Sequence, residues 1–347
     1  MMKKVHCRTV AHEYDILIGP ESWKHASEFP GRRLLVRDGN VTDPGIPADG
    51  TAVLPPGEQH KTFAAVESVC RAAARLRLNR KDRFIALGGG VTGDLTGFAA
   101  AIYMRGVPFI QIPTTLLAMV DASVGGKTAA DLPEGKNLIG AFHQPDAVFI
   151  DPGFLRTLPR RELICGMAEV VKTAVILDGA FFDRLEELGS APVAAPDFDG
   201  VFPELIGRCC ELKASVVEAD EKEQNLRAIL NYGHTYGHAV EQLSAFTIPH
   251  GEGVAMGMTA AGMTALLLGM WTKEEFARQQ RLLAALELPT VLPRSFTPEQ
   301  IIEIMGTDKK NDHSGIRLVL PERLGAARTV SGVPLSLMHQ ALEACYD

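Results

Sequence analysis

The chain passes from strand to helix within one short stretch, Phe84-Ile85-Ala86-Leu87-Gly88-Gly89-Gly90-Val91-Thr92-Gly93-Asp94-Leu95-Thr96-Gly97. Its apolar start is typical of a buried strand, and the glycines after it open a helical pattern. Glycines let the backbone approach a ligand closely, and the N–H groups at a helix start attract anionic oxygens. This order of strand, glycines and helix predicts a pyrophosphate-binding turn centred on Gly90, Val91, Thr92 and Gly93. A tight turn without a ligand is the alternative, because the spacing is not G-x-G-x-x-G.

Similar apolar runs lie on both sides of this stretch, at Leu34–Val36, Ala52–Leu54, Phe109–Ile112 and Val148–Ile150. Strands that alternate with helices predict a parallel sheet with crossover helices. Beyond Pro159 the pattern is helical at 160–177, 201–219, 225–243, 252–269 and 273–286, with a small strand or hairpin at 315–321. We therefore predict an α/β fold: an N-terminal Rossmann-like parallel-sheet domain (1–158), a mainly α-helical domain (159–347), and an active site in the cleft between them.

The composition excludes several classes of function. A formal net charge of -7 argues against a nucleic-acid partner, because phosphate backbones bind basic surfaces. Six cysteines without a C-x-x-C pair fit reduced thiols. The amino terminus has no apolar signal core, and no segment has the length of a membrane span. We expect a cytoplasmic protein with no nucleic-acid or membrane partner.

Polar residues follow several of the predicted strands. In open parallel sheets, ligands bind outside the carboxyl ends of the strands. Asp38 could bond a ribose hydroxyl there, although a plain turn explains it equally well. The other candidates for a nucleotide at this edge are Glu58, Lys61, Thr114 and Thr115.

A metal site is indicated in the second half of the chain. Arg227, Asn231, His234 and His238 recur at steps of four, three and four, which predicts one face of a single helix. Glu169 lies in an otherwise apolar helix, and His250 precedes another. Two histidines and one carboxylate form a common zinc ligand set, here Glu169, His234 and His250. A pair of His234 and His238, or histidines satisfied within the core, are the alternatives, and zinc, cobalt and iron are not distinguished.

Cationic residues suggest a substrate that carries two anionic groups. Lys127, Lys136 and Asn137 lie in short glycine-bearing segments of the kind that bind phosphate, although not in a Walker A loop. Arg105, Lys172 and Lys213 add further cations. Each alone is explained as a surface charge, but together they could hold a phosphate and a carboxylate if the fold gathers them.

Read together, these segments resemble the 3-dehydroquinate synthase family from Pro56 to Pro321. The resemblance is carried by GGGVTGDLTGF, IPTTLLAMVDASVGGKT, GKNLIGAFHQP, LPRRELICGMAEVVK, LRAILNYGHTYGHAVE, HGEGVA and DKK. It implies zinc or cobalt on Glu169, His234 and His250. It implies NAD contacts from Glu58, Lys61, Asp94, Thr114, Thr115, Lys127, Lys136, Phe154, Leu155, Arg156 and Thr157. Substrate binding or proton handling is implied for Arg105, Asp121, Lys127, Asn137, Lys172, Lys213, Arg227, Asn231, His238 and one lysine of Lys309-Lys310, for which we choose Lys310.

By this resemblance the chain converts 3-deoxy-D-arabino-heptulosonate 7-phosphate to 3-dehydroquinate and phosphate, a lyase reaction of the shikimate pathway, as a homodimer. Tyr232 and Tyr236 stand where other members often carry Leu and Phe, which should leave the histidine spacing intact. Three alternatives stay open. They are another sugar phosphate cyclase, a metal-dependent polyol or alcohol dehydrogenase, and a non-catalytic binding protein descended from the enzyme.

Overall fold

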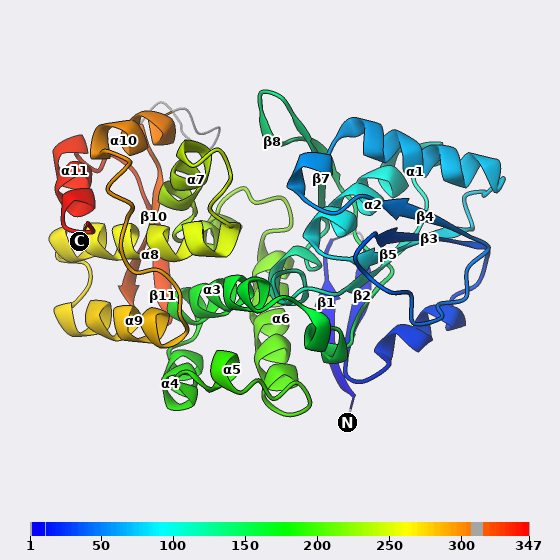
Figure 1. Cartoon of the computed structure of the whole chain (residues 1–347), viewed down its shortest axis with the longest axis horizontal. Coiled ribbons are helices and arrows are strands. Elements are labelled where there is room, and N and C mark those ends of the chain that lie inside the picture. The colour runs from blue at the N-terminus through cyan, green and yellow to red at the C-terminus, as the bar shows by residue number, and fades with distance from the viewer. Residues whose placement is uncertain (1, 11, 307–314, 347) are drawn as a thin grey trace. The chain divides into compact units, whose positions relative to one another are not determined.

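The computed structural model describes residues 2–10, 12–306 and 315–346. By compactness the chain divides into two units, Met1–Pro159 with Asp197–Lys222, and Arg160–Pro196 with Glu223–Asp347 (Figure 1). The first change of unit lies one residue after the predicted boundary. A single division at residue 158 does not describe the units, however, because helix α6 (Val201–Ala219) returns to the first one and packs against its strand β1 (Lys3–Arg8).

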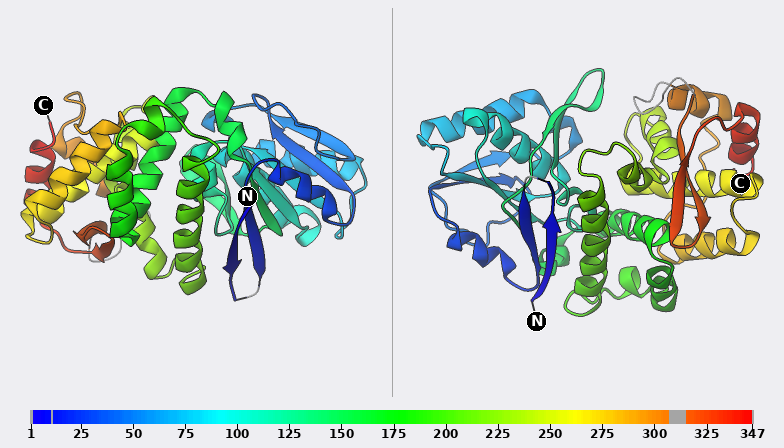
Figure 2. Two further views of the ribbon diagram at one scale, coloured as in Figure 1. Left: turned by 90° about the horizontal axis from the view of Figure 1, so that it is seen from below. Right: turned by 180° about the vertical axis from the view of Figure 1, so that it is seen from behind.

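The first unit is built on a seven-stranded sheet in the order β1-β2-β9-β6-β5-β3-β4. The strands after β1 are β2 (Glu13–Ile18), β3 (Arg33–Asp38), β4 (Gly50–Leu54), β5 (Arg83–Gly88), β6 (Phe109–Pro113) and β9 (Ala147–Ile150). Every neighbouring pair is parallel except β1 with β2. The predicted parallel sheet is therefore confirmed in β3, β4, β5, β6 and β9. The N-terminal antiparallel pair, seen from two further sides in Figure 2, was not predicted, although its alternating burial is typical of half-buried strands.

Successive residues of the central strands face two separate cores. Leu34 and Phe84 pack with α1 (Phe63–Arg75) and α2 (Gly90–Ile102) on one face. Leu35 and Ile85 pack on the other face with Ala26 of η1 (Ser22–Glu28). Burial on both faces explains why these strands read as continuous apolar runs.

Short elements complete the first unit: η2 (Glu58–His60), η3 (Tyr103–Arg105), the π-helical turn η4 (Ala118–Ala122) and η5 (Pro152–Thr157). The strands β7 (Lys127–Leu132) and β8 (Gly135–Phe142) pair as an antiparallel hairpin. The segments that we expected to form phosphate-binding loops are thus partly strand. Lys127 begins β7, and Lys136 and Asn137 lie at the start of β8.

The second unit is mainly helical, as predicted. Its elements are α3 (Arg160–Leu177), α4 (Gly179–Leu188), α5 (Ala191–Ala194), η6 (Leu226–Asn231), α7 (His234–Leu243), α8 (His250–Leu267), α9 (Lys273–Ala285), α10 (Pro298–Gly306), the hairpin β10 (Leu318–Arg323) and β11 (Ala326–Val330), and α11 (Leu335–Glu343). Among the described helices, none has both the length and the apolar character that a membrane crossing requires.

The prediction of one continuous helix over 225–243 is wrong. The segment is broken between η6 and α7, where Gly233 has a φ of 76°. A Cβ at this position would lie 2.8 Å from both the Val254 carbonyl oxygen and Met258 Cγ of α8. The break follows from this close packing, which requires a glycine in the left-handed conformation.

Candidate active site

Three side chains of the second unit meet from three different helices. Glu169 lies in the middle of α3, His234 begins α7, and His250 begins α8. Their ligand atoms all lie within 4.8 Å of one another. The structure thus brings together the carboxylate and the two imidazoles that the sequence analysis selected.

The spacing of these atoms suits a tetrahedral cation. Glu169 Oε1 lies 3.6 Å from His234 Nε2 and 3.5 Å from His250 Nε2. Ligand bonds of about 2.0–2.1 Å at a tetrahedral zinc place neighbouring ligand atoms roughly 3.3 Å apart. The residues therefore fit a divalent metal with only small adjustments, and three protein ligands leave one position for a substrate oxygen or water.

Hydrogen bonds hold both imidazole rings with Nε2 toward Glu169. His234 Nδ1 lies 3.0 Å from the Tyr232 carbonyl oxygen, so it donates to that oxygen. His250 Nδ1 lies 2.9 Å from Glu241 Oε1. Such contacts to the second ring nitrogen set the tautomer and orientation of a metal-binding histidine.

The charges around this site are paired. Glu169 and Lys172 are both 1% exposed and form an ion pair through Glu169 Oε2. Burial by itself lowers the pKa of His250, but hydrogen bonds to Glu169 and Glu241 outweigh it and raise the pKa to about 10. A cation is accordingly favoured at this position, since two buried carboxylates face it.

Glycines allow α7 and α8 to approach closely enough to bring the histidines together. A Cβ on Gly257 would lie 1.8 Å from the Gly233 carbonyl oxygen, and one on Gly237 would lie 2.7 Å from the Gly253 carbonyl oxygen. Real Cβ atoms essentially never come that near to backbone oxygens. These small residues therefore have a packing role, which explains the glycines that flank the histidines in the sequence.

The remaining polar residues of the predicted stripe lie on both sides of the helix break. Arg227 is 1% exposed in η6, and Asn231 at its end donates to Glu223 Oε1 at 2.8 Å. The ring of His238 lies 5.3 Å from that of His234 and 6.0 Å from that of His250, between centroids. His238 therefore stays beside the three clustered side chains even though the stripe is not one helical face.

Two glutamates near this site were missed by the sequence analysis. One is Glu223, the partner of Asn231, and the other is Glu241, which also forms a second possible metal-binding group with His238 and His250. Glu241 lies seven residues after His234, two helical turns away on the same face, and this spacing could have revealed it. Glu223 has a φ of 55° outside a regular element and left no periodic signal.

In the first unit, the predicted nucleotide residues follow the carboxyl ends of neighbouring parallel strands. The glycine stretch joins β5 to α2 as predicted, with Gly89 as the N-cap, but residues 90–93, on which the turn was predicted to centre, form the first turn of α2 itself. Thr114 and Thr115 follow β6, and the segment of Glu58 and Lys61 follows β4. Because these strands are parallel, their carboxyl ends form one edge of the sheet, and open parallel sheets bind their ligands at this edge.

A buried ion pair reinforces this edge. Lys61 Nζ lies 2.6 Å from Asp94 Oδ2 and 2.6 Å from Asn137 Oδ1. Burial lowers the pKa of Lys61, but Asp94 and Glu58 outweigh it and keep that pKa above its usual value. Lys136 also faces Glu58, with 3.7 Å between Nζ and Oε1. Lys61 and Asp94, which we expect to contact NAD, are thus linked by hydrogen bonds to Asn137, which we expect to contact the substrate.

The other residues expected to contact a nucleotide have identifiable local roles. Asp38 ends β3 and accepts from the Asn40 N–H at 2.8 Å, which is the turn contact that we weighed as an alternative. In η5, Leu155 is buried in the core with 1% exposure. Arg156 donates to Asp199 at 2.6 Å, and Phe154 and Thr157 lie in the same short helix after β9.

Asp121 and Lys213 are brought together although 92 residues separate them in the sequence. Lys213 Nζ of α6 donates to Asp121 Oδ1 at 2.8 Å and to its carbonyl oxygen at 2.5 Å. Asp121 lies in a π-helical turn, a conformation common at functional sites. This contact places Lys213 in the first unit and not, as predicted, among the residues of the helical domain.

Arg105 lies at the end of α2 that is remote from the glycine turn. Helix α2 begins at the carboxyl edge of the sheet and its 13 residues extend roughly 20 Å back along it. Arg105 follows its far end, with a φ of 68° and an exposed side chain. Lys309 and Lys310 lie outside the described residues.

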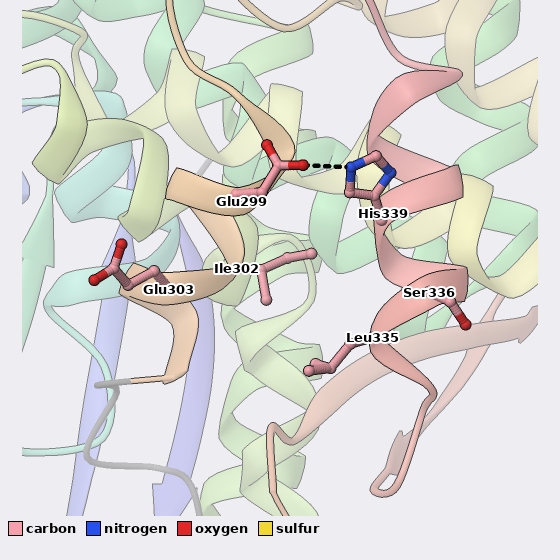
Figure 3. Close-up of a pocket in the computed structure, with 6 residues that line it drawn as sticks. All are labelled: Glu299, Ile302, Glu303, Leu335, Ser336 and His339. Atoms are coloured by element: carbon pink, nitrogen blue, oxygen red, sulfur yellow. Dashed lines mark hydrogen bonds and ion pairs between the residues drawn. The ribbon is translucent and has the colours of Figure 1, made fainter.

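A separate hollow lies between α10 and α11 and contains none of the predicted site residues (Figure 3). Its lining combines aliphatic side chains with an exposed ion pair, 2.7 Å between Glu299 Oε1 and His339 Nε2. The lining residues are Glu299, Ile302, Glu303, Leu335, Ser336 and His339.

Comparisons with known proteins identify the family of this chain. Residues 51–165 match the N-terminal domain of 3-dehydroquinate synthase, and residues 166–311 match its C-terminal domain. The 3-dehydroquinate synthase of Synechococcus sp. is 50% identical over 299 residues, 84% of this chain and 79% of the relative.

Solved structures of sugar phosphate cyclases are similar over the whole fold. One is 2-epi-5-epi-valiolone synthase from Streptomyces hygroscopicus subsp. jinggangensis 5008 with NAD+ and Zn2+ bound, with a TM-score of 0.88 and 30% identity over 96% of each chain. Another is 2-deoxy-scyllo-inosose synthase complexed with carbaglucose-6-phosphate, NAD+ and Co2+, with a TM-score of 0.87 and 27% identity over 99% of this chain and 100% of the other. With both domain matches and half-identical relatives, this chain belongs to the 3-dehydroquinate synthase family.

Proposed function

We propose that this chain is a carbon-oxygen lyase that converts 3-deoxy-D-arabino-heptulosonate 7-phosphate to 3-dehydroquinate and phosphate, with NAD and one zinc or cobalt ion. The observation that carries the proposal is the convergence of Glu169, His234 and His250 at metal-ligand spacing. Membership of the 3-dehydroquinate synthase family supports the choice of substrate. The similar cyclases with NAD+ and Zn2+ or Co2+ support the choice of cofactors.

When bound, NAD would take up and return a hydride, and the metal would supply Lewis acidity at the hydroxyl that is oxidised. The chain itself would hold the metal with Glu169, His234 and His250. It would bind NAD at the carboxyl edge of the sheet, with the glycine turn facing the pyrophosphate. The contact between Lys61 and Asp94 would keep this edge rigid, because both groups are satisfied within the protein.

Cationic side chains would hold the two anionic groups of the substrate. Lys172 and Arg227 are buried in the second unit, and Lys213 is buried in the first. Buried cations attract carboxylate and phosphate more strongly than exposed ones, since water screens them less. They would fix the substrate in a conformer that is suitable for phosphate loss and ring closure.

Proton transfer would fall to His238, assisted by Asn231 and Asp121. The His238 ring lies beside those of His234 and His250, so a proton donor or acceptor would be close to the reacting carbons. Asn231 is held by Glu223, which gives its amide a defined orientation.

A coupled phosphate-release assay tests the proposal. Purified protein with NAD and Zn2+ or Co2+ should release phosphate from the heptulosonate phosphate without net accumulation of NADH. His250→Ala should remove both bound metal and turnover. Activity in a metal-free His250→Ala protein would refute the ligand assignment.

The same assay separates the alternatives. Stoichiometric NADH with a polyol would indicate a dehydrogenase. Turnover of another sugar phosphate, and none of the heptulosonate phosphate, would indicate a different cyclase. A homodimer and a cytoplasmic location also belong to the proposal, and light scattering after size exclusion and cell fractionation test them.

A further inference from the structure

We infer that Glu241 is a positioning residue that holds His250 by Nδ1 so that its Nε2 faces the metal. This inference rests on the metal site of the proposed function. Its starting observation is the 2.9 Å separation between Glu241 Oε1 and His250 Nδ1, with Glu241 only 3% exposed.

The distances favour a positioning role of Glu241 over a ligand role. Glu241, His238 and His250 also form a group that could hold a metal ion. An ion shared by Glu241 and His250 Nδ1 would keep these two atoms roughly 3.3 Å apart, as at any tetrahedral zinc. The observed 2.9 Å is instead an ordinary N–H···O hydrogen bond. On the other side of the ring, Nε2 lies 3.5 Å from Glu169 Oε1, which is a ligand-to-ligand distance.

The two nitrogens of His250 therefore have different tasks. Nδ1 donates to Glu241, and Nε2 faces Glu169 and would present its lone pair to a cation there once the metal displaces its proton. The Glu241 carboxylate fixes the ring plane and makes the imidazole a better donor to a cation. His234 receives the corresponding support from the Tyr232 carbonyl oxygen. The two ligands are thus anchored by different means, one by a charge and one by the backbone.

The packing of α7 on α8 leaves room for this contact. A Cβ on Gly253 would lie 3.0 Å from Glu241 Cγ and 3.2 Å from its Oε1. With glycine at 253, the Glu241 side chain can cross from α7 to the first residue of α8. His250 begins that helix after Pro249, so no preceding helical turn of α8 orients its ring. A side-chain contact from the neighbouring helix supplies the orientation instead.

Metal affinity, measured by chelator competition with Co2+ and Zn2+, tests the inference. Glu241→Gln keeps the shape and an acceptor oxygen but removes the charge, and should weaken binding roughly tenfold. Glu241→Ala removes the contact altogether and should weaken metal binding by up to about 100-fold. The matched control is Glu252→Gln, since Glu252 lies in the same first turn of α8 but contacts Arg161 at 2.6 Å. It should leave the affinity unchanged.

Stability of the metal-free proteins separates positioning from a general role in folding. Glu241→Gln should unfold at nearly the wild-type urea concentration while its Co2+ absorption spectrum changes. If Glu241→Ala does not fold, Glu241→Gln carries the test. Wild-type affinity in a folded Glu241→Gln variant together with an unaltered spectrum overturns the inference. If wild-type protein itself binds neither Co2+ nor Zn2+, the metal site of the proposed function fails as well.

Discussion

Replacement of Gly257 by alanine should separate α7 from α8 and damage the candidate metal site. The new Cβ would lie 1.8 Å from the Gly233 carbonyl oxygen and 2.7 Å from the Gly237 nitrogen. Both are backbone atoms, so no side-chain rotation can relieve the clash. Since real Cβ contacts are essentially never under 3.0 Å, the two helices must move apart locally by at least 1.2 Å.

Two opposing terms set the expected loss of stability. Alanine gains about 1 kcal/mol over glycine in a helix interior. Overpacking costs about 1–3 kcal/mol, and a clash with unmovable backbone belongs at the upper end. We expect a net loss of about 2 kcal/mol in the free energy of unfolding. Because His234 directly follows Gly233, it should shift by about 1 Å, beyond the ~0.5 Å that a functional site tolerates, and Co2+ affinity should fall at least roughly tenfold.

The assay is urea unfolding of the metal-free variant together with Co2+ titration. The matched control is Gly306→Ala at the end of α10, where a new Cβ would meet no heavy atom within 4 Å among the described residues other than its chain neighbours. This control should match wild type in both measurements. If Gly257→Ala is as stable as Gly306→Ala and binds Co2+ equally well, the packing argument is wrong.

Three further predictions concern other parts of the chain. Tyr232→Phe should lower the free energy of unfolding by about 1–3 kcal/mol, because Tyr232 donates to the buried Gln279 Oε1 at 2.7 Å. Adding Gln279→Leu to this variant should recover part of the lost stability, as measured by urea unfolding. Glu275→Gln should lower the free energy of unfolding by about 0.3–1 kcal/mol at pH 7, because it removes the negative charge at the N-terminus of α9 while keeping an oxygen for the capping box with Thr272. Burial raises the pKa of Glu275, but Thr272 and the Leu324 N–H outweigh it, so the folded pKa is below the unfolded one. Its contribution is therefore full above the unfolded pKa and is lost as pH falls through the folded pKa, and unfolding measured below pH 4 should show the difference from wild type shrinking. Burial raises the pKa of the thiols of Cys165, Cys210 and Cys345 to about 12. In native protein at pH 8 these three thiols should therefore react slowly with a thiol reagent. Fast labelling of any of them, measured by mass spectrometry, would contradict this.

Much of the fold could be read from local patterns. The helices predicted at 160–177 and 201–219 agree with α3 and α6. Helix α6 has a periodic apolar face, whereas α3 is buried on all sides from Leu163 to Ile176 and is recognised by its long, largely apolar run. The parallel strands were recognisable because burial on both faces makes them continuously apolar. Local pattern could not show that α6 belongs with the first unit, since an amphipathic helix does not specify which surface it covers.

The candidate metal site was selected from residue types and from the resemblance to a family, and its geometry needed the structure. The three side chains are distant in sequence and come from separate helices, so only packing brings their atoms together. The spacing of Glu241 from His234 could have pointed to this glutamate, but its contact with His250, nine residues away on another helix, depends on the packing of α7 against α8.

By itself, the sequence determined which strands are buried on both faces, where the glycine stretch follows a strand, most helix boundaries and the family. Only the tertiary structure decided where helix 225–243 breaks, which ring nitrogens face Glu169, and that Arg105 follows the end of α2 that is remote from the glycine turn. The physical reason is that periodicity depends on near neighbours in the chain. The φ of Gly233 and the orientation of an imidazole depend instead on atoms of other helices, whose positions are set when the core packs.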